Sequence, residues 1–149
     1  MLERLKELNI TIPEVAKPLA AYVPAVRTGD LVYTSGQLPI SENNVIYQGK
    51  VGSDLSVEEG KAAARLCVIN CLAAVTTCAD LDSIDRIVKI TGYIQCNPDF
   101  YQQAVVLNGA SELLKDLLGE KGQHARAAIG VNSLPLNAAC EVEMIVKLK

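Results

Sequence analysis

The chain has 149 residues and a mass of 16.0 kDa, which suits one domain and is short for two. Half of its residues are hydrophobic and 21% are charged, a balance that excludes an intrinsically disordered chain. The net charge of −3 and the scattered Lys and Arg residues argue against a general nucleic-acid binder. Aromatic residues, at 4%, are too few for a base-stacking platform.

Localisation is predicted by exclusion. Residues 1–8 contain no continuous apolar run of the kind found in a signal peptide. The sequence contains no run of 18 apolar residues, so no membrane span is predicted. The five Cys residues form no CxxC pair, and an odd number of thiols without a secretion signal indicates a reducing compartment. We therefore expect a cytoplasmic protein.

The first third of the chain is predicted to be mostly extended. Helical spacing of leucines predicts a short helix over residues 2–8, inside an N-terminal extension over 1–20. A hairpin is predicted from β-forming runs at 21–27 and 31–35, separated by a Gly-Asp turn. A polar loop with a short strand at 45–47 follows.

The rest of the chain predicts two long helices and three strands. Ser56 and Glu59 form a capping box, so a helix should run from there to about residue 79. We predict a central strand at 86–96 and a second helix, begun by turn residues, at about 99–118. Two final strands are predicted at 126–132 and 139–148. The order β-β-α-β-α-β-β predicts an α+β domain over residues 1–149, with one mixed sheet and both helices on one face. Oligomerisation would cover the other face.

Few residues offer chemistry in this sequence. His124 is the only His, and it lacks the partners of a metal site. Cys67 and Cys71 share a helix face but fit buried core thiols better than ligands or nucleophiles. Arg126 begins an otherwise apolar strand, where a charge is usually paired or holds an anion. If the turn at 134–137 pairs the last two strands, Glu141 falls near Arg126, and an ordinary ion pair is one interpretation.

Three motifs in order resemble the RidA/YjgF family of imine/enamine deaminases. The C-terminal motif is the run Ala-Arg-Ala-Ala-Ile-Gly-Val at 125–131, with Leu-Pro at 134–135 and Cys-Glu-Val-Glu at 140–143. The N-terminal motif is Tyr22 with Thr-Ser-Gly-Gln-Leu-Pro at 34–39. Asn108 also falls where the family places an Asn. The resemblance covers about residues 20–148.

The resemblance implies a chorismate-mutase-like fold and a homotrimer with clefts between subunits. It also implies a cofactor-free enzyme that hydrolyses 2-imino acids, such as 2-iminopropanoate, to 2-keto acids and ammonia. Its partners would be small imino or keto acids, with no metal, nucleic acid or membrane. A trimer that binds keto acids without turnover is the alternative.

The resemblance also implies a role for each candidate residue. Arg126 would bind the substrate carboxylate, and Glu141 would orient a water and move its proton. Tyr22 of a neighbouring subunit would contact the substrate, and backbone groups near Gly36 and Ala128 would hold its nitrogen and carboxylate. Asn108 completes the predicted substrate-binding set. The sequence departs from the family at Ala128, where Cys is frequent, and at Gly130, where an acidic residue is frequent.

Overall fold

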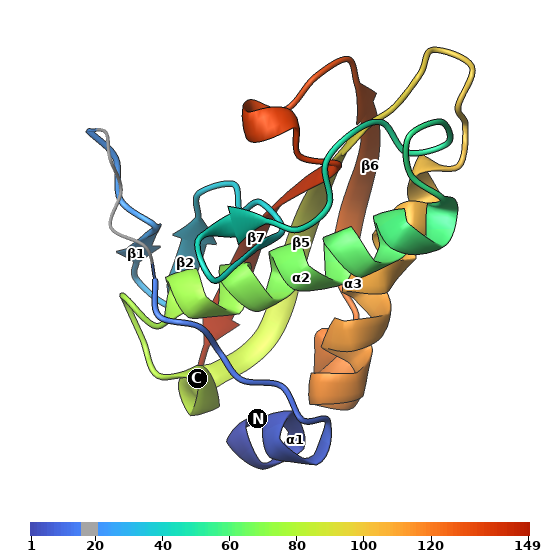
Figure 1. The fold of residues 1–149 in the computed structure, drawn as a ribbon. Coiled ribbons are helices and arrows are strands. Elements are labelled where there is room, and N and C mark those ends of the chain that lie inside the picture. Colours follow the sequence, from blue (N-terminus) through green and yellow to red (C-terminus); the bar gives the residue numbers. More distant parts are fainter. Residues whose placement is uncertain (16–20) are drawn as a thin grey trace.

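The computed structural model describes residues 1–15 and 21–149 as a layer of helices on a layer of strands (Figure 1). Part of the predicted N-terminal extension, residues 16–20, lies outside the described residues. The strands are β1 Ala25–Thr28, β2 Leu31–Thr34, β3 Ile40–Ser41, β4 Asn44–Val45, β5 Ile84–Gln95, β6 Ala125–Val131 and β7 Cys140–Leu148. The helices are α1 Leu2–Glu7, α2 Val57–Val75 and α3 Gln103–Leu118, with short 3₁₀ turns at Leu81–Ser83, Gly119–Gly122 and Pro135–Asn137.

Five strands form one mixed sheet in the order β1-β2-β7-β5-β6. Strands β5 and β6 run parallel, and the other neighbours are antiparallel. Helix α3 makes the crossover between the two parallel strands, as a parallel connection requires. Both long helices cover the same face of the sheet (Figure 1). The predicted α+β fold, with a mixed sheet and two main helices, is confirmed.

Local chemistry explains where the elements begin and end. The Ser56 hydroxyl and the Glu59 carboxylate form the predicted capping box at the start of α2. The helix ends at Val75, earlier than expected, because the hydroxyls of Thr76 and Thr77 bond back to carbonyls three residues earlier. Helix α3 begins at Gln103 rather than near residue 99, because the Asn-Pro-Asp sequence forms a turn of its own first.

The expected short strand at 45–47 is part of a small hairpin instead. Strands β3 and β4 pair through Ile40–Val45 and Ser41–Asn44. The two turn residues, Glu42 and Asn43, both have positive φ, at 50° and 63°. Two consecutive left-handed residues match the twist of a tight hairpin.

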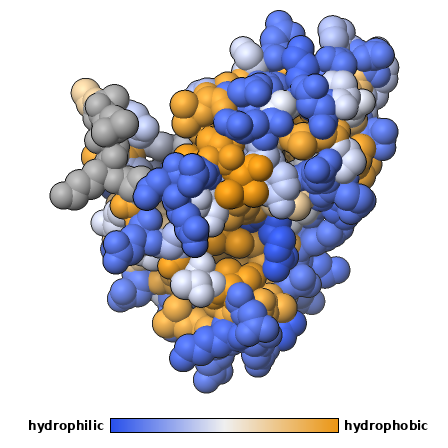
Figure 2. Space-filling model, viewed as in Figure 1, coloured by the Kyte–Doolittle hydropathy of each residue, from blue (hydrophilic) through white to orange (hydrophobic). Residues whose placement is uncertain are grey.

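The core lies between the sheet and the two helices, and small residues allow the layers to approach closely. Cys67, Cys71 and Ala74 of α2 are fully buried against the sheet. Gly109 of α3 lies so close to the backbone of α2 at Lys61 that a Cβ there would overlap it. In the space-filling view from the helix side, hydrophobic residues show in the middle of the layer and hydrophilic residues surround them (Figure 2).

Candidate functional site

Arg126 projects from β6 toward helix α3. It pairs with Ile90 of β5, a buried residue on the face that the helices cover. Its Nη1 donates to the Asn108 Oδ1 at 2.9 Å and to the Ser111 hydroxyl at 3.1 Å. Its Nη2 donates to the Ala104 carbonyl at 3.2 Å. Three residues on one side of α3 therefore hold the guanidinium, and two predicted site residues, Arg126 and Asn108, are in direct contact.

The opposite edge of the Arg126 guanidinium is open. An Arg side chain has five N–H donors, and the three bonds to α3 use the Nη1 pair and one Nη2 hydrogen. Among the described residues, no acceptor bonds to Nε–H or to the other Nη2 hydrogen. These two donors share one edge and match the two oxygens of a carboxylate. Arg126 is exposed, so this edge is open to a ligand.

Ala128 and Gly130 follow Arg126 on the same face of β6 because side chains alternate along a strand. Ala128 is partly buried against the core. A Cβ at Gly130 would lie 2.7 Å from the Gln103 side-chain nitrogen and 3.0 Å from the Cys96 sulfur. An acidic side chain here would displace Gln103, which accounts for glycine at this departure from the family motif. We call Arg126, Asn108 and Ala128 the Arg126 half-site.

Glu141 lies on the other face of the sheet. The pairing of the last two strands that would place Glu141 near Arg126 does not occur, because β5 lies between β6 and β7. Glu141 alternates with the buried Cys140 and Val142, so its side chain points away from the helices. Its neighbour in the sheet is Tyr93 of β5. One chain therefore does not bring Arg126 and Glu141 together.

Gly36 packs against the Glu141 carboxyl. The backbones of Gln37 and Val142 exchange two hydrogen bonds, at 2.8 and 3.0 Å, which bring this segment alongside β7. A Cβ at Gly36 would overlap the Glu141 carboxylate oxygen, so only glycine fits while the carboxylate keeps this position. We call Glu141 and Gly36 the Glu141 half-site.

The surroundings of Glu141 suit proton transfer. Burial raises its pKa, because a half-buried carboxylate is poorly solvated, and the neighbouring Glu143 carboxylate raises the pKa further. The Tyr93 hydroxyl donates to Glu143 at 3.4 Å. A carboxyl with a raised pKa gives up and takes protons closer to neutral pH than an ordinary Glu does.

Tyr22 lies on the other side of the sheet from the Arg126 strand. The residue is 59% exposed, and two residues separate it from β1. Strands β1 and β6 form opposite edges of the sheet. Within one chain, Tyr22 therefore does not reach Arg126.

Sequence reasoning missed Ser111 and assigned no role to His124 in the site. Ser111 Oγ lies 3.0 Å from His124 Nε2, and His124 Nδ1 lies 2.6 Å from the Gly122 carbonyl. Both residues thus belong to the contact network of Arg126. The signal was present in the spacing of Asn108 and Ser111, which places two polar side chains on one side of a helix.

Cys67 and Cys71 lie in the core, as the sequence predicted. Both are fully buried, as is Cys140. Burial raises the pKa of Cys71 to about 12, and burial likewise raises the pKa of Cys67. A nucleophilic thiol needs a lowered pKa, so Cys67 and Cys71 are structural. Among residues 1–15 and 21–149, no three His, Cys, Asp or Glu residues are grouped to hold a metal ion.

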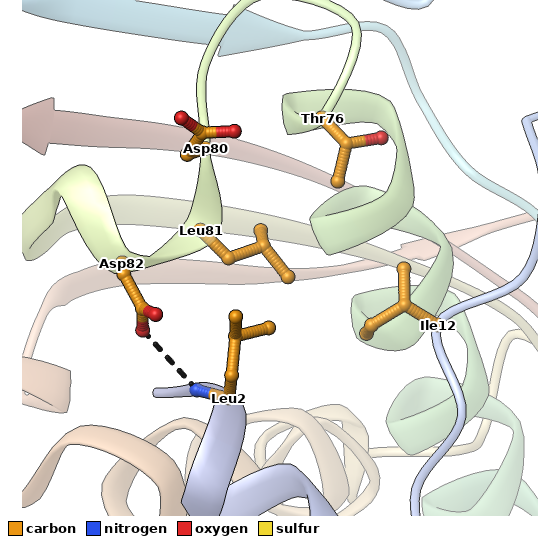
Figure 3. Close-up of a pocket in the computed structure, with 6 residues that line it drawn as sticks. All are labelled: Leu2, Ile12, Thr76, Asp80, Leu81 and Asp82. Carbon is orange, nitrogen blue, oxygen red and sulfur yellow. Dashed lines mark hydrogen bonds between the residues drawn. The ribbon is translucent and has the colours of Figure 1, made fainter.

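A pocket near the N-terminus contains none of the predicted site residues. Leu2, Ile12 and Leu81 point toward one another inside it (Figure 3). The Leu2 amide donates to the Asp82 carboxylate at 3.2 Å. The remaining lining residues are Thr76 and Asp80. This pocket offers an apolar floor with acidic groups at its rim, which does not suit a carboxylate ligand.

The mixed sheet, with two helices on one face and an exposed Arg on its edge strand, defines an α+β protein of chorismate-mutase-like fold. The sequence model of the family described as "YjgF/chorismate mutase-like, putative endoribonuclease" matches residues 3–148. The chain belongs to this YjgF/RidA family. In the described part of the chain, no helix has the length and apolar character needed to cross a membrane.

Three relatives cover nearly all of the chain. Protein TCP17 of Trypanosoma cruzi is 40% identical over 97% of this chain and 91% of its own length. The crystal structure of Atu1372 from Agrobacterium tumefaciens, a protein of unknown function, is 45% identical, covers 99% of this chain and 91% of its own, and has a TM-score of 0.91. A relative from Dermatophagoides farinae, named 2-iminobutanoate/2-iminopropanoate deaminase, is 26% identical over 94% of this chain and 95% of its own.

Proposed function

We propose that this protein is a hydrolase that converts reactive 2-imino acids and their enamine forms to 2-keto acids and ammonia. The observation that carries the proposal is the open edge of the Arg126 guanidinium, held in place by Asn108. A 2-imino acid presents a planar carboxylate beside the reactive C=N bond, and that carboxylate fits this edge. The Dermatophagoides farinae deaminase, a relative within the family, supports this choice of substrate class.

Glu141 is the general base of the proposed reaction. It takes a proton from water as the water oxygen bonds to the imine carbon, and it returns the proton to nitrogen. The product of this step is a carbinolamine, whose hydroxyl proton passes through Glu141 to the same nitrogen. The carbon–nitrogen bond then breaks as the carbonyl forms, ammonia leaves and the keto acid remains. The reaction needs only water as co-substrate, so no cofactor takes part.

We further propose that the site is shared between subunits of a homotrimer. Arg126 and Glu141 lie on opposite faces of one sheet, so a site that uses both needs each from a different chain. Tyr22 of a neighbouring subunit would contact the substrate from across the interface. The backbone near Gly36 would reach the substrate beside Glu141, and the backbone of Ala128 would reach it beside Arg126.

The direct test is turnover of imines generated by an amino-acid oxidase, followed as keto-acid release. Two charge-assisted hydrogen bonds are lost in Arg126→Ala, so kcat/KM should fall by at least about a hundredfold. Arg126→Lys should also be impaired, because Lys lacks the two-donor edge. Arg4→Ala, an Arg of helix α1, is the matched control and should keep full activity. Full activity in Arg126→Ala would refute the proposal, and keto-acid binding without turnover in the wild type would make the protein a binder.

A subunit-mixing experiment tests the shared site. Arg126→Ala and Glu141→Gln are each expected to be nearly inactive. Trimers formed from an equal mixture should regain about a quarter of wild-type activity, because random assembly places an intact Arg126 beside an intact Glu141 at that frequency. No recovery in mixed trimers that form normally would place both groups of a site in one chain.

A further inference from the structure

A hydrogen-bonded chain leads from the half-buried His124 to the guanidinium of Arg126. The Gly122 carbonyl can only accept, so His124 Nδ1 carries the proton toward it, at 2.6 Å. His124 Nε2 is then an acceptor and receives the Ser111 hydroxyl hydrogen at 3.0 Å. The lone pairs of the Ser111 oxygen remain for the Arg126 Nη1 donor at 3.1 Å. Each donor in the chain therefore has one acceptor, in one direction.

The charge state of His124 agrees with this direction. Burial lowers the pKa of His124; the bond to the Gly122 carbonyl opposes the shift, and the nearby Arg126 charge adds to it. The imidazole is therefore neutral near pH 7 and keeps its Nε2 lone pair for Ser111. A hydroxyl without this acceptor could rotate and direct its hydrogen toward Arg126, which has only donors to offer.

The geometry of α3 makes the Ser111 orientation matter. Asn108 and Ser111 are three residues apart, so they lie on the same side of the helix and hold both hydrogens of Nη1. Fixing Nη1 fixes the plane of the whole guanidinium, because its nitrogens are conjugated. The plane in turn sets where the open Nε and Nη2 edge points.

We propose that His124, acting through Ser111, is a positioning residue that aims the open edge of Arg126 at the ligand carboxylate. This inference rests on the proposed function, because that function supplies the carboxylate. The positioned edge favours a ligand whose carboxylate meets the guanidinium in its plane, and a small 2-keto or 2-imino acid can bind in this way. His124 itself touches no substrate in this scheme.

The test compares four variants by calorimetric binding of pyruvate and by imine hydrolysis. Ser111→Ala and His124→Leu should each weaken pyruvate binding by about two- to tenfold, the equivalent of one neutral hydrogen bond. His124→Gln, whose amide oxygen can replace the Nε2 acceptor, should stay close to wild type. The double variant should be no weaker than the weaker single variant, because both changes break one relay. The changes should appear mainly in KM.

Ser53→Ala, in an exposed turn, is the matched serine control and should bind pyruvate like wild type. Unchanged binding in His124→Leu, additive losses in the double variant, or equal losses in the Gln and Leu variants would each overturn the positioning role. If the wild type neither binds pyruvate nor hydrolyses imines, the proposed function fails. The relay is then judged by NMR of the Arg126 side chain, whose Nη hydrogens should be resolved in wild type and averaged in Ser111→Ala. Identical spectra would overturn it.

Discussion

Glu141 lies in surroundings that oppose the charge of its carboxylate. Burial and the Glu143 carboxylate raise its pKa in the folded chain above the unfolded value. Folding is therefore favoured by protonation of Glu141, and this contribution is lost as the pH rises through the folded pKa. Glu141→Gln should raise the Tm at pH 8 and leave it nearly unchanged at pH 4, measured by thermal denaturation. A lower Tm at pH 8 would show that the carboxylate is stabilised by a contact that the amide cannot make.

Glu143 tunes the same carboxylate from two residues away on the same face of β7. Removing its charge in Glu143→Gln removes one of the two causes of the raised Glu141 pKa. A general base must be ionised to act, so the acid limb of the kcat profile should move to lower pH in this variant. The pH dependence of imine hydrolysis measures the shift. A limb that does not move would assign the titration to another group.

The capping box at the start of α2 is an element-level device with a predictable cost. The Ser56 hydroxyl accepts from the Glu59 amide at 3.1 Å, and the Glu59 carboxylate accepts from the Ser56 amide at 2.8 Å. Ser56→Ala should lower the free energy of unfolding by about 1 kcal/mol, a typical value for a lost N-cap. Urea denaturation measures it, with Ser53→Ala as the control that should change little. A neutral Ser56→Ala would mean that tertiary contacts alone hold this end of the helix.

Helices α2 and α3 contact each other through a glycine. A Cβ at Gly109 would overlap the backbone of Lys61, which has no rotamer to change. Gly109→Ala should therefore force the helices apart and cost about 1–3 kcal/mol or more of stability in urea denaturation. Val105→Ala, at a partly exposed position of α3, should change stability by less than about 1 kcal/mol. A stable Gly109→Ala protein would indicate that the helix pair can shift without loss of packing.

The sheet face that the helices leave uncovered is the expected contact surface between copies of the chain. It presents Tyr33 and Ile129, which are 40% and 42% exposed, from strands on either side of Glu141 and Glu143. Apolar residues on an open sheet face favour association with further copies of the chain. We expect sedimentation equilibrium to give three times the chain mass at micromolar concentration.

Charged substitutions test whether this face forms the interface. Tyr33→Lys combined with Ile129→Lys should dissociate the trimer and abolish turnover, although Arg126 and Glu141 remain. Ile46→Lys, at an exposed apolar position beside the β3–β4 hairpin, is the control and should stay trimeric and active. An active monomer would exclude a site shared between subunits.

Local sequence patterns account for most of the elements, and the resemblance to the family motifs indicated the residues of both half-sites. The capping residues, the alternation of β7 and the turn residues act over a few neighbouring positions, so they are readable without the fold. The motif residues Arg126 and Glu141 were also identified from the sequence. The exact ends of α2 and α3 depended on hydroxyl back-bonding and a separate turn, which helix periodicity does not report.

Only the structure determined the order of the strands in the sheet and the face of the sheet on which each site residue lies. A strand pairs with whichever partner the whole fold brings beside it, so eight residues between β6 and β7 did not make them neighbours. The β5–α3–β6 order did favour a parallel pair, and that pair turns Arg126 toward α3 and away from Glu141. The Ser111–His124 relay likewise joins a helix to a loop across 13 residues. Such contacts depend on packing in three dimensions, which periodicity along the chain does not predict.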